Sequence, residues 1–288
     1  MADNGKNVPP QEIFIPFPEE RRKQLKKPEC NFSLYFQRMA SWKWNNRGEL
    51  DADDNAIKNF LDKSNEKKSF HCVEKSLSKK HEMLASYVEF AKKSGLICLK
   101  ITAKTISPFI TGLGSGHPTE TGIILDRNIG VPYIPASSIK GVMRFAYALN
   151  IANGRTEVPD SELEKYFGTT DEQKKEQKDK QRGQLMFFDA YPTTKPKLKM
   201  DIMNPHYGPY YQGGGKVQPV ETENPVPIKF LVVKEETEFD FYCLFRPLET
   251  DDAEEVENDI KKMFDTAFKV LGFGGKTAIG YGRFKEVK

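Results

Sequence analysis

The sequence has few of the residues on which metal and disulfide chemistry depend. Its 288 residues include four cysteines and four histidines, which are scattered along the chain. The cysteines form no CxxC pair, and with the histidines they show no metal-ligand spacing. The pattern therefore predicts reduced thiols, no metal and no other cofactor. Because reduced thiols are typical of reducing compartments, we expect a cytoplasmic protein.

Long apolar runs and a strong net charge are also missing. No segment approaches the roughly 20 apolar residues that span a bilayer, and the N-terminal residues lack the apolar core of a signal peptide. We expect no membrane association. The chain has 44 basic and 41 acidic residues, a net charge of +3. Any surface for nucleic acid must therefore be a local patch rather than a field over the whole molecule.

The stretch from Thr111 to Arg144 contains two unusual blocks, TGLGSGHPTETG and VPYIPASSIKGVMR. Gly112, Gly114 and Gly116 in the first block allow positive φ angles and a close approach of backbone N–H groups to a ligand. The second block begins with prolines and predicts a helix that starts near Ser137 or Ser138. Apolar residues at helical spacing predict its buried stripe: Ile139, Val142, Met143, Ala146 and Leu149.

The first turn of this predicted helix carries cations where acids are preferred. Lys140 lies in that turn and Arg144 follows one turn later on the same face. Because the N-terminus of a helix is itself partly positive, two cations there favour a bound anion. Together with the Ser137 and Ser138 hydroxyls they are candidates for a phosphate site. The alternative is a solvated basic helix face.

A second glycine-rich segment, LGFGGKTAIGYGRF, covers Leu271 to Phe284. Its GGKT is not a P-loop, because Val270 occupies the position of the required earlier glycine and the segment follows a helix and precedes a strand. We interpret it as a backbone cradle for RNA phosphate or ribose, with a flexible connection as the alternative. Its candidate residues are Gly274, Gly275, Lys276 and Arg283.

These two segments, in this order, resemble the RAMP superfamily of CRISPR-associated RNA-binding proteins. The match is closest to the sixth-subunit family of the type III-B (Cmr) effector complex, whose hallmarks resemble GxGxxHPxETG and G-PYIP-SS-KG--R. The resemblance covers roughly Leu96 to the C-terminus and implies a subunit without catalysis that holds the guide RNA near its 3′ end. It also implies several partners: guide and target RNA, the backbone RAMP subunit, the small subunit and the other capping RAMP subunit.

The order of the predicted elements gives the fold class independently. Strands at 96–103, 184–190, 230–233, 238–246 and 279–287, with a weaker candidate at 198–203, are combined with helices from Ser137 to Asn150 and over 251–271. The strands at 230–233 and 238–246 are expected to form a hairpin. The pattern predicts an α+β, ferredoxin-like (split βαβ) fold with both helices on one sheet face and the other face free for RNA or protein.

We expect two regions in the chain. Residues 1–94 are predicted to form an N-terminal tail and helical extension, with helices within 19–44 and 51–93. Residues 95–288 are predicted to form the RAMP domain. Insertions are expected near 154–182 and 204–227; the charge-rich run at 169–182 is interpreted as a solvated loop.

His117 is the one residue that suggests catalysis. It could act as a general acid or base in metal-independent RNA cleavage, but it has no evident partner and loop structuring or RNA contact is favoured. The resemblance implies that target-cleaving backbone subunits carry an Asp after the first strand, and TISPFITGLGSGHPTETG contains none. We therefore assign no catalytic residue. A repeat-cleaving endoribonuclease and a protein-only scaffold remain the alternatives.

Overall fold

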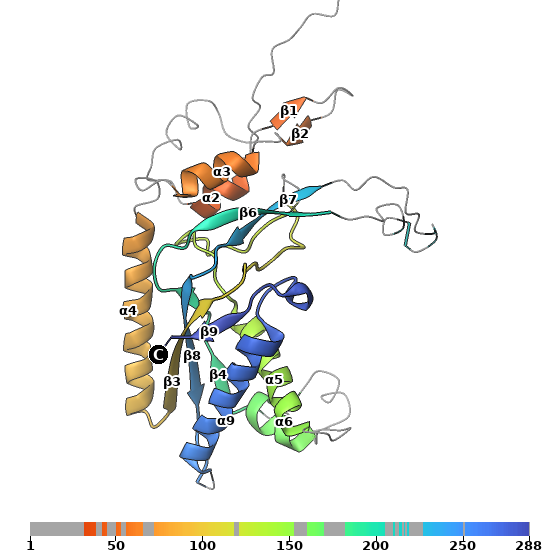
Figure 1. Ribbon diagram of the computed structural model, residues 1–288. Coiled ribbons are helices and arrows are strands. Elements are labelled where there is room, and N and C mark those ends of the chain that lie inside the picture. Colours follow the sequence, from red (N-terminus) through yellow and green to blue (C-terminus); the bar gives the residue numbers. More distant parts are fainter. Residues whose placement is uncertain are drawn as a thin grey trace, which may run out of the picture.

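An antiparallel sheet forms the centre of the molecule (Figure 1). The computed structural model describes residues 32–38, 42–44, 50–52, 56–65, 72–117, 121–152, 160–169, 182–204, 210, 213–214, 216, 218, 227–249 and 251–287. The sheet has the order β4-β8-β3-β9, with β5 also paired to β8, and every neighbouring pair is antiparallel. Its strands are β3 (Ile97–Thr105), β4 (Leu185–Phe187), β5 (Tyr191–Pro192), β8 (Glu238–Phe245) and β9 (Phe284–Glu286).

One face of this sheet is covered by helices α5 (Ala136–Ala152) and α9 (Ala253–Thr266), with α6 (Asp160–Phe167) beside α5. Alternate β8 residues point toward this face, and the Phe241 ring lies 5.8 Å from Phe264 and 5.2 Å from Phe268. Asp252 caps α9 by accepting hydrogen bonds from two backbone N–H groups of its first turn. A π-helical turn, η1 (Ala267–Leu271), continues α9. Both predicted helices are confirmed.

The opposite face of the sheet is covered by α4 (Cys72–Lys93) (Figure 1). A helix within 51–93 was expected, but its position on this face was not. His81 of α4 reaches Asp240 on β8, and the Tyr87 ring packs edge-on against Phe188 at 5.3 Å. The Cys98 thiol of β3 donates a hydrogen bond to Val88 O. The expectation that this face stays free is therefore wrong: α4 packs on it through an apolar stripe that includes Leu77 and Leu84.

A second, two-stranded sheet is formed by β6 (Leu198–Met203) and β7 (Ile228–Val233). Helix α3 (Ala56–Asn65) packs against both strands, and α2 (Phe32–Arg38) lies beside α3. The weak strand candidate at 198–203 is thus confirmed, but the predicted hairpin between 230–233 and 238–246 is wrong. Both edges of β8 are already occupied, by β3 on one side and by β4 and β5 on the other, so β7 has no edge of β8 left to pair with.

The remaining elements begin or end at other residues than the sequence predicted. Strand β4 covers only part of 184–190, and the last strand begins at Phe284, after a 3-10 turn η2 (Thr277–Ile279). A short antiparallel pair, β1 (Trp42–Trp44) with β2 (Leu50–Ala52), replaces part of the helices expected in the N-terminal extension. Residues 19–31, 170–181 and most of 204–227 lie outside the described residues.

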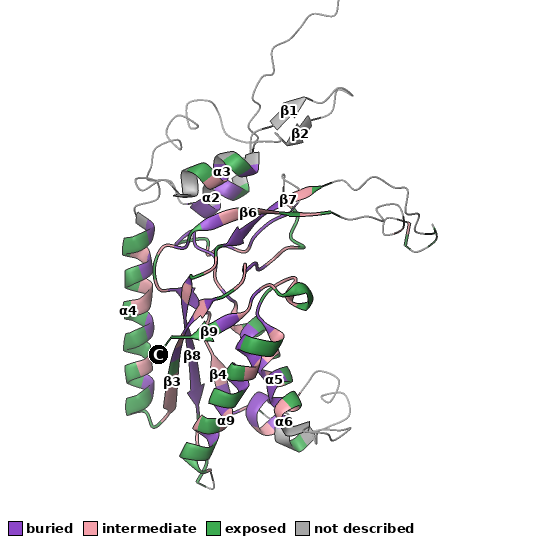
Figure 2. Cartoon of the chain, in the orientation of Figure 1, coloured by how far each residue is buried: buried purple, intermediate pink, exposed green. Residues whose placement is uncertain are grey.

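Figure 2 shows that burial is concentrated between the sheet and its covering helices. One hydrophobic cluster connects Phe36, Phe60 and Leu77 of the N-terminal region with Phe109, Phe241 and Phe273 of the rest of the chain. The molecule is therefore an α+β fold with antiparallel sheets and one continuous core. Among the described residues, no helix combines the length and the apolar character needed to cross a bilayer.

Candidate nucleic-acid interface

The N-terminus of α5 is already engaged by a carboxylate from another element. The Ala136 N–H donates a 2.7 Å hydrogen bond to Asp189 Oδ1, from the segment that joins β4 to β5. Asp189 therefore satisfies one of the backbone donors that open a helix, and it offsets part of the positive end of the dipole. Ser137 and Ser138 lie exposed in this first turn. An anion at this helix would be bound mainly by side chains farther along the turn.

Three cations gather beside this helix start. Lys140 and Arg144 project from α5, and Arg182 precedes β4. Burial lowers the pKa of Lys140 below its ordinary value, and repulsion from Arg144 and Arg182 lowers it further. Arg144 Nη1 donates a long 3.4 Å hydrogen bond to Gly168 O. Within the described ranges no carboxylate forms an ion pair with any of the three, so the patch has uncompensated positive charge.

The first glycine-rich loop contains two kinds of glycine. Gly112 has φ +76°, and a Cβ added there would lie 2.4 Å from Ile124 Cγ1, so packing requires this glycine. Gly114 and Gly116 are exposed, and added Cβ atoms would meet nothing within 4 Å. Among the described residues of this loop, the open backbone that could approach a ligand is therefore that of 114–116.

His117 connects this loop to the N-terminal helices. Its ring stacks on Phe36 at 4.0 Å, and its Nε2 lies 2.7 Å from Phe36 O. Because a carbonyl oxygen can only accept, Nε2 must carry the proton and donate it to this bond. Burial lowers the pKa of His117 below its ordinary 6.5. These contacts tie His117 to the N-terminal helices.

The C-terminal glycine-rich loop packs directly against the segment that precedes the first loop. Gly275 N donates to Ile110 O at 2.7 Å, and Gly282 N donates to Pro108 O at 2.8 Å. Gly274 has φ +88°, and an added Cβ would lie 2.1 Å from Ile110 O. At Gly275 the nearest atom to an added Cβ is 3.6 Å away. Gly274 therefore serves the fold, whereas Gly275 has room for a side chain.

The charged residues of the C-terminal loop are held by their own surroundings. Lys276 Nζ lies 5.2 Å from the centre of the Phe230 ring and 5.6 Å from that of Tyr281. Arg283 donates from its backbone N–H to Ser107 Oγ and from Nη2 to Thr277 O. Its buried Nη1 has no hydrogen-bond partner within the described part of the chain. Arg283 thus supports the loop from inside, and Lys276 is stabilised by two aromatic faces.

The three candidate segments meet around Ile110 and Thr111. The C-terminal loop bonds to Ile110 O, while Thr111 Oγ1 donates to Tyr133 O in the segment that leads into α5. The structure thus brings both glycine-rich loops together, although they are far apart in the sequence. Lys140 and Arg144 form their cluster with Arg182 instead.

Sequence reasoning missed two residues of this region. Arg182 was assigned to the solvated charge-rich loop, although its charge reaches Lys140. Asp189 was assigned no role from the sequence, whereas it caps α5. The position of Asp189 directly after an apolar strand marks it as a residue at a strand end. The partner it contacts, 53 residues earlier, could not be inferred from the sequence.

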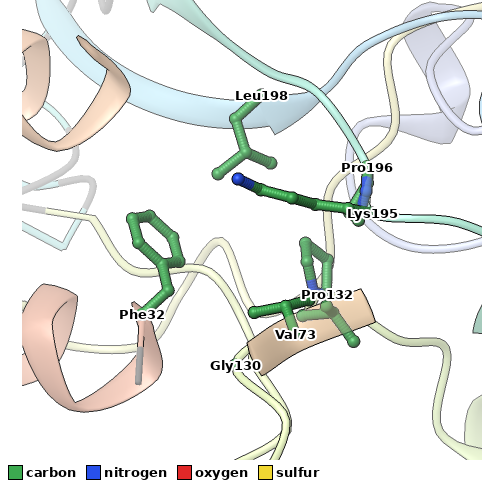
Figure 3. A pocket seen from close by; sticks show the side chains of 8 residues that line it. Phe32, Val73, Gly130, Pro132, Lys195, Pro196 and Leu198 are labelled. Carbon is green, nitrogen blue, oxygen red and sulfur yellow. The ribbon is translucent and has the colours of Figure 1, made fainter. Parts of the chain in front are cut away.

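Two cavities of the described region lie near α4. The cavity in Figure 3, between Phe32, Val73, Pro132 and Lys195, holds about 20 Å³, enough for a single water molecule. A larger groove of about 380 Å³ lies under α4, but its buried Asp240 is bound by Lys100 and Thr102. No group of three or more metal-binding side chains occurs among the described residues.

Comparisons with known proteins agree with this architecture. The sequence profile of the RAMP superfamily matches residues 102–285. The chain is 32% identical to the CRISPR system Cmr subunit Cmr6 of Pyrococcus furiosus over 337 aligned positions, covering 96% of this chain and 92% of that protein. The Cmr6 protein of Saccharolobus solfataricus is 25% identical over 173 positions, covering 59% of this chain and 50% of that protein.

A solved structure supports the fold. A chain of the type III-B Cmr-beta complex bound to cognate target RNA, determined by cryo-EM, superposes with a TM-score of 0.53 at 24% identity. The match covers 73% of this chain and 65% of that chain. From the matched profile and the near full-length similarity to the Pyrococcus protein, the chain belongs to the RAMP superfamily, as a member of the Cmr6 family of CRISPR Cmr subunits.

Proposed function

We propose that this chain is a non-catalytic RNA-binding subunit of a type III-B Cmr effector complex, in which it holds the guide RNA near its 3′ end and caps the row of backbone subunits. The observation that carries the proposal is the cluster of Lys140, Arg144 and Arg182, which has no carboxylate partner in the described ranges. Such cations bind phosphate through charge and hydrogen bonds. Contacts to phosphates fix the position of an RNA without reading its sequence.

The local character of the charge supports a phosphate-binding role. The net charge is only +3, so the field of the whole chain attracts RNA weakly. Burial and, after it, repulsion from Arg144 and Arg182 lower the pKa of Lys140, and the repulsion is relieved when a phosphate binds between the three cations. The exposed backbone at Gly114 and Gly116, together with Gly275 and Lys276, would extend the contact surface from α5 toward the two glycine-rich loops.

The proposed partners follow from the relatives. The Pyrococcus and Saccharolobus proteins are Cmr subunits, and the structural neighbour comes from a Cmr complex with target RNA. We expect this chain to contact guide and target RNA, the backbone RAMP subunit, the small subunit and the other capping RAMP subunit. The proposed location is the cytoplasm.

We also propose that the central sheet is the ferredoxin-like core of the RAMP domain at residues 95–288, with residues 1–94 as an extension. The strands β3, β4, β8 and β9 with helices α5 and α9 follow the order strand, helix, strand, strand, helix, strand. Their order in the sheet, β4-β8-β3-β9, places the first and third strands at the centre. This arrangement supports the split βαβ topology.

The contacts of His117 argue against the endoribonuclease alternative. A general acid or base must lie within hydrogen-bond reach of the reacting proton, and Nε2 of His117 is used by Phe36 O. The imidazole also stacks on Phe36, so it is oriented toward the N-terminal helices. A non-catalytic role therefore fits His117 better.

The test is a measurement of RNA affinity against salt concentration. Replacing Lys140→Gln and Arg144→Gln should weaken binding of guide RNA and reduce the slope of log affinity against log salt by roughly one unit per lost phosphate contact. Lys79→Gln with Lys92→Gln is the matched control, because it removes the same charge from exposed positions of α4 on the other sheet face. The control should keep the wild-type slope.

Three outcomes would contradict the proposal. Equal slopes of log affinity against log salt in both double variants would mean that Lys140 and Arg144 only form a solvated basic helix face. Cleavage of repeat RNA by the purified chain without metal would favour the endoribonuclease. A complex that assembles with the wild-type chain, but in which this chain forms no crosslink to RNA, would favour the scaffold. Crosslinks from α5 to the 3′ part of the guide would support the proposed position.

A further inference from the structure

The exposed face of α5 carries an aromatic ring that the fold does not bury. Phe145 is 56% exposed, although α5 packs Ile139, Met143 and Ala146 into the core. It follows Arg144 directly in the sequence, so a large apolar ring and a cation lie about 100° apart around the exposed side of the helix. Exposed aromatic rings next to cations are typical of surfaces on which bases of single-stranded nucleic acid stack.

Gly141 lies on the same face without a structural reason. Glycine in a helix interior is less favourable than alanine. Its φ is not in the positive region, and an added Cβ would meet nothing within 4 Å, not even the Phe145 side chain one turn later. The fold would therefore accept a larger residue here. A glycine at an exposed position allows another molecule to approach the helix backbone closely.

The helical repeat arranges these residues in a row across the surface. With 3.6 residues per turn, Gly141 lies between Arg144 on one side and Phe145 on the other, and Lys140 lies beyond Arg144. A cationic edge, an open strip of backbone and an aromatic edge thus follow one another around the helix. Phosphate, ribose and base follow one another in the same order in a nucleotide.

We propose that this face of α5 is a nucleotide subsite for single-stranded RNA: phosphate binds at Lys140 and Arg144, ribose lies over Gly141, and the base stacks on Phe145. This inference rests on the proposed RNA-binding function and adds a base-stacking contact to it. The combination of an exposed ring with cations that have no carboxylate partner in the described part of the chain favours single-stranded RNA over a protein partner. A stacked base is held without regard to its identity.

The first experiment compares two RNA probes by fluorescence anisotropy with the full-length chain. One is an unstructured single-stranded RNA, and the other is the same ribose-phosphate chain without bases. Phe145→Ala should weaken binding of the RNA by roughly 5- to 150-fold, the range for loss of one base–aromatic stack, at an unchanged salt slope. It should leave binding of the abasic chain unchanged.

Two control variants accompany this experiment. Phe145→Trp should bind RNA as well as wild type, and Leu149→Ala, at the next exposed apolar position of α5, should have no effect.

A second pair of variants separates the subsite from the fold. Gly141→Ala and Gly141→Leu should both melt at or above the wild-type temperature, because an added Cβ meets nothing within 4 Å and both residues favour the helix more than glycine. Only the leucine should weaken RNA binding, since its bulk fills the place of the ribose. Higher thermal stability with lower RNA affinity is a result that misfolding cannot produce.

The failures of the inference and of the proposed function are distinguishable. If Phe145→Ala binds RNA like wild type while Lys140→Gln with Arg144→Gln does not, the stacking subsite is overturned and the phosphate contacts stand. If Phe145→Ala keeps its RNA affinity but loses a neighbouring protein subunit, the ring is a protein contact and the inference is wrong. If the wild-type chain binds neither RNA nor the abasic chain, the proposed function itself falls.

Discussion

At the scale of single residues, several groups whose chemistry suggested a ligand have contacts within the protein. His117 donates to Phe36 O, and Arg283 donates to Thr277 O. Gly274 fits closely against Ile110 O. The residue types showed that these positions are unusual. Only the tertiary contacts show that packing within the protein, and not a ligand, explains why these residues are present. Lys140 and Arg144 differ, because the described residues supply no acidic partner for them.

The two adjacent glycines of the C-terminal loop should respond differently to alanine. Gly274→Ala should lower the free energy of unfolding by more than about 1 kcal/mol, because the new Cβ meets Ile110 O and the positive φ disfavours it. Gly275→Ala should be close to neutral, since its nearest neighbour is 3.6 Å away. Chemical denaturation of the two variants measures this difference. Equal stabilities would mean that the loop rearranges at little cost.

The stability of the protein should depend on His117 at acidic pH. Burial lowers the pKa of His117 in the folded state below the 6.5 of the unfolded chain. Above pH 6.5 the imidazole is neutral in both states. As the pH falls below 6.5, the unfolded chain takes up the proton first, so folding becomes less favourable. Denaturation curves across this range should show a smaller loss of stability in His117→Phe, which keeps a ring on Phe36 and cannot be protonated. The same acid dependence in both proteins would contradict this role.

At the scale of elements, the sequence predicted those whose signals are local. Helices α5 and α9 and strands β3, β6 and β8 follow from apolar periodicity, and the end of η1 at Gly272 follows from the residue type. Leu149 is an exception, because it fits the apolar stripe of α5 but is 42% exposed. The partners of the elements were not predictable. The pairing of β7 with β6 depends on which edges of β8 are already occupied, and the position of α4 depends on contacts such as Tyr87 with Phe188.

Helix α4 should depend on its buried stripe to stay on the sheet. Leu77 is 1% exposed, and Leu77→Ala should cost about 2–5 kcal/mol of stability, the range for large-to-small changes in a core. Phe90 on the same helix is 68% exposed, and Phe90→Ala should be within about 0.5 kcal/mol of wild type. Hydrogen exchange of β3 amides should accelerate only in the first variant. Equal protection in both would show that α4 adds little to the sheet.

At the scale of the whole molecule, the proposed boundary near residue 95 does not divide the hydrophobic core. Phe36, Phe60, Val73 and Leu77 belong to the same cluster as the residues of the central sheet. The N-terminal region therefore completes the core instead of forming a separate unit. The interface of α4 with the sheet also covers the face that split βαβ proteins can leave open.

Deletion of residues 1–94 should therefore destabilise the remainder of the chain. The truncated protein would expose the β8 face that α4 covers, including Asp240 and Tyr242, and the Phe36 contact of His117 would be lost. We expect a lower melting temperature and a greater tendency to aggregate than in the full chain. Light scattering together with thermal melting measures both. A truncated protein as stable as the full chain would establish residues 95–288 as an autonomous domain.

The two described free cysteines lie on opposite faces of the central sheet. Cys98 is half-buried on the side of α4, and Cys243 is buried on the side of α5 and α9, in register with Leu99. Burial raises the pKa of both thiols, which slows their reaction with alkylating reagents. The rates at which the Cys98 and Cys243 thiols are alkylated therefore report how often each side of the sheet opens. The labelling rate of Cys98 follows lifting of α4 alone, whereas that of Cys243 follows opening of the whole core.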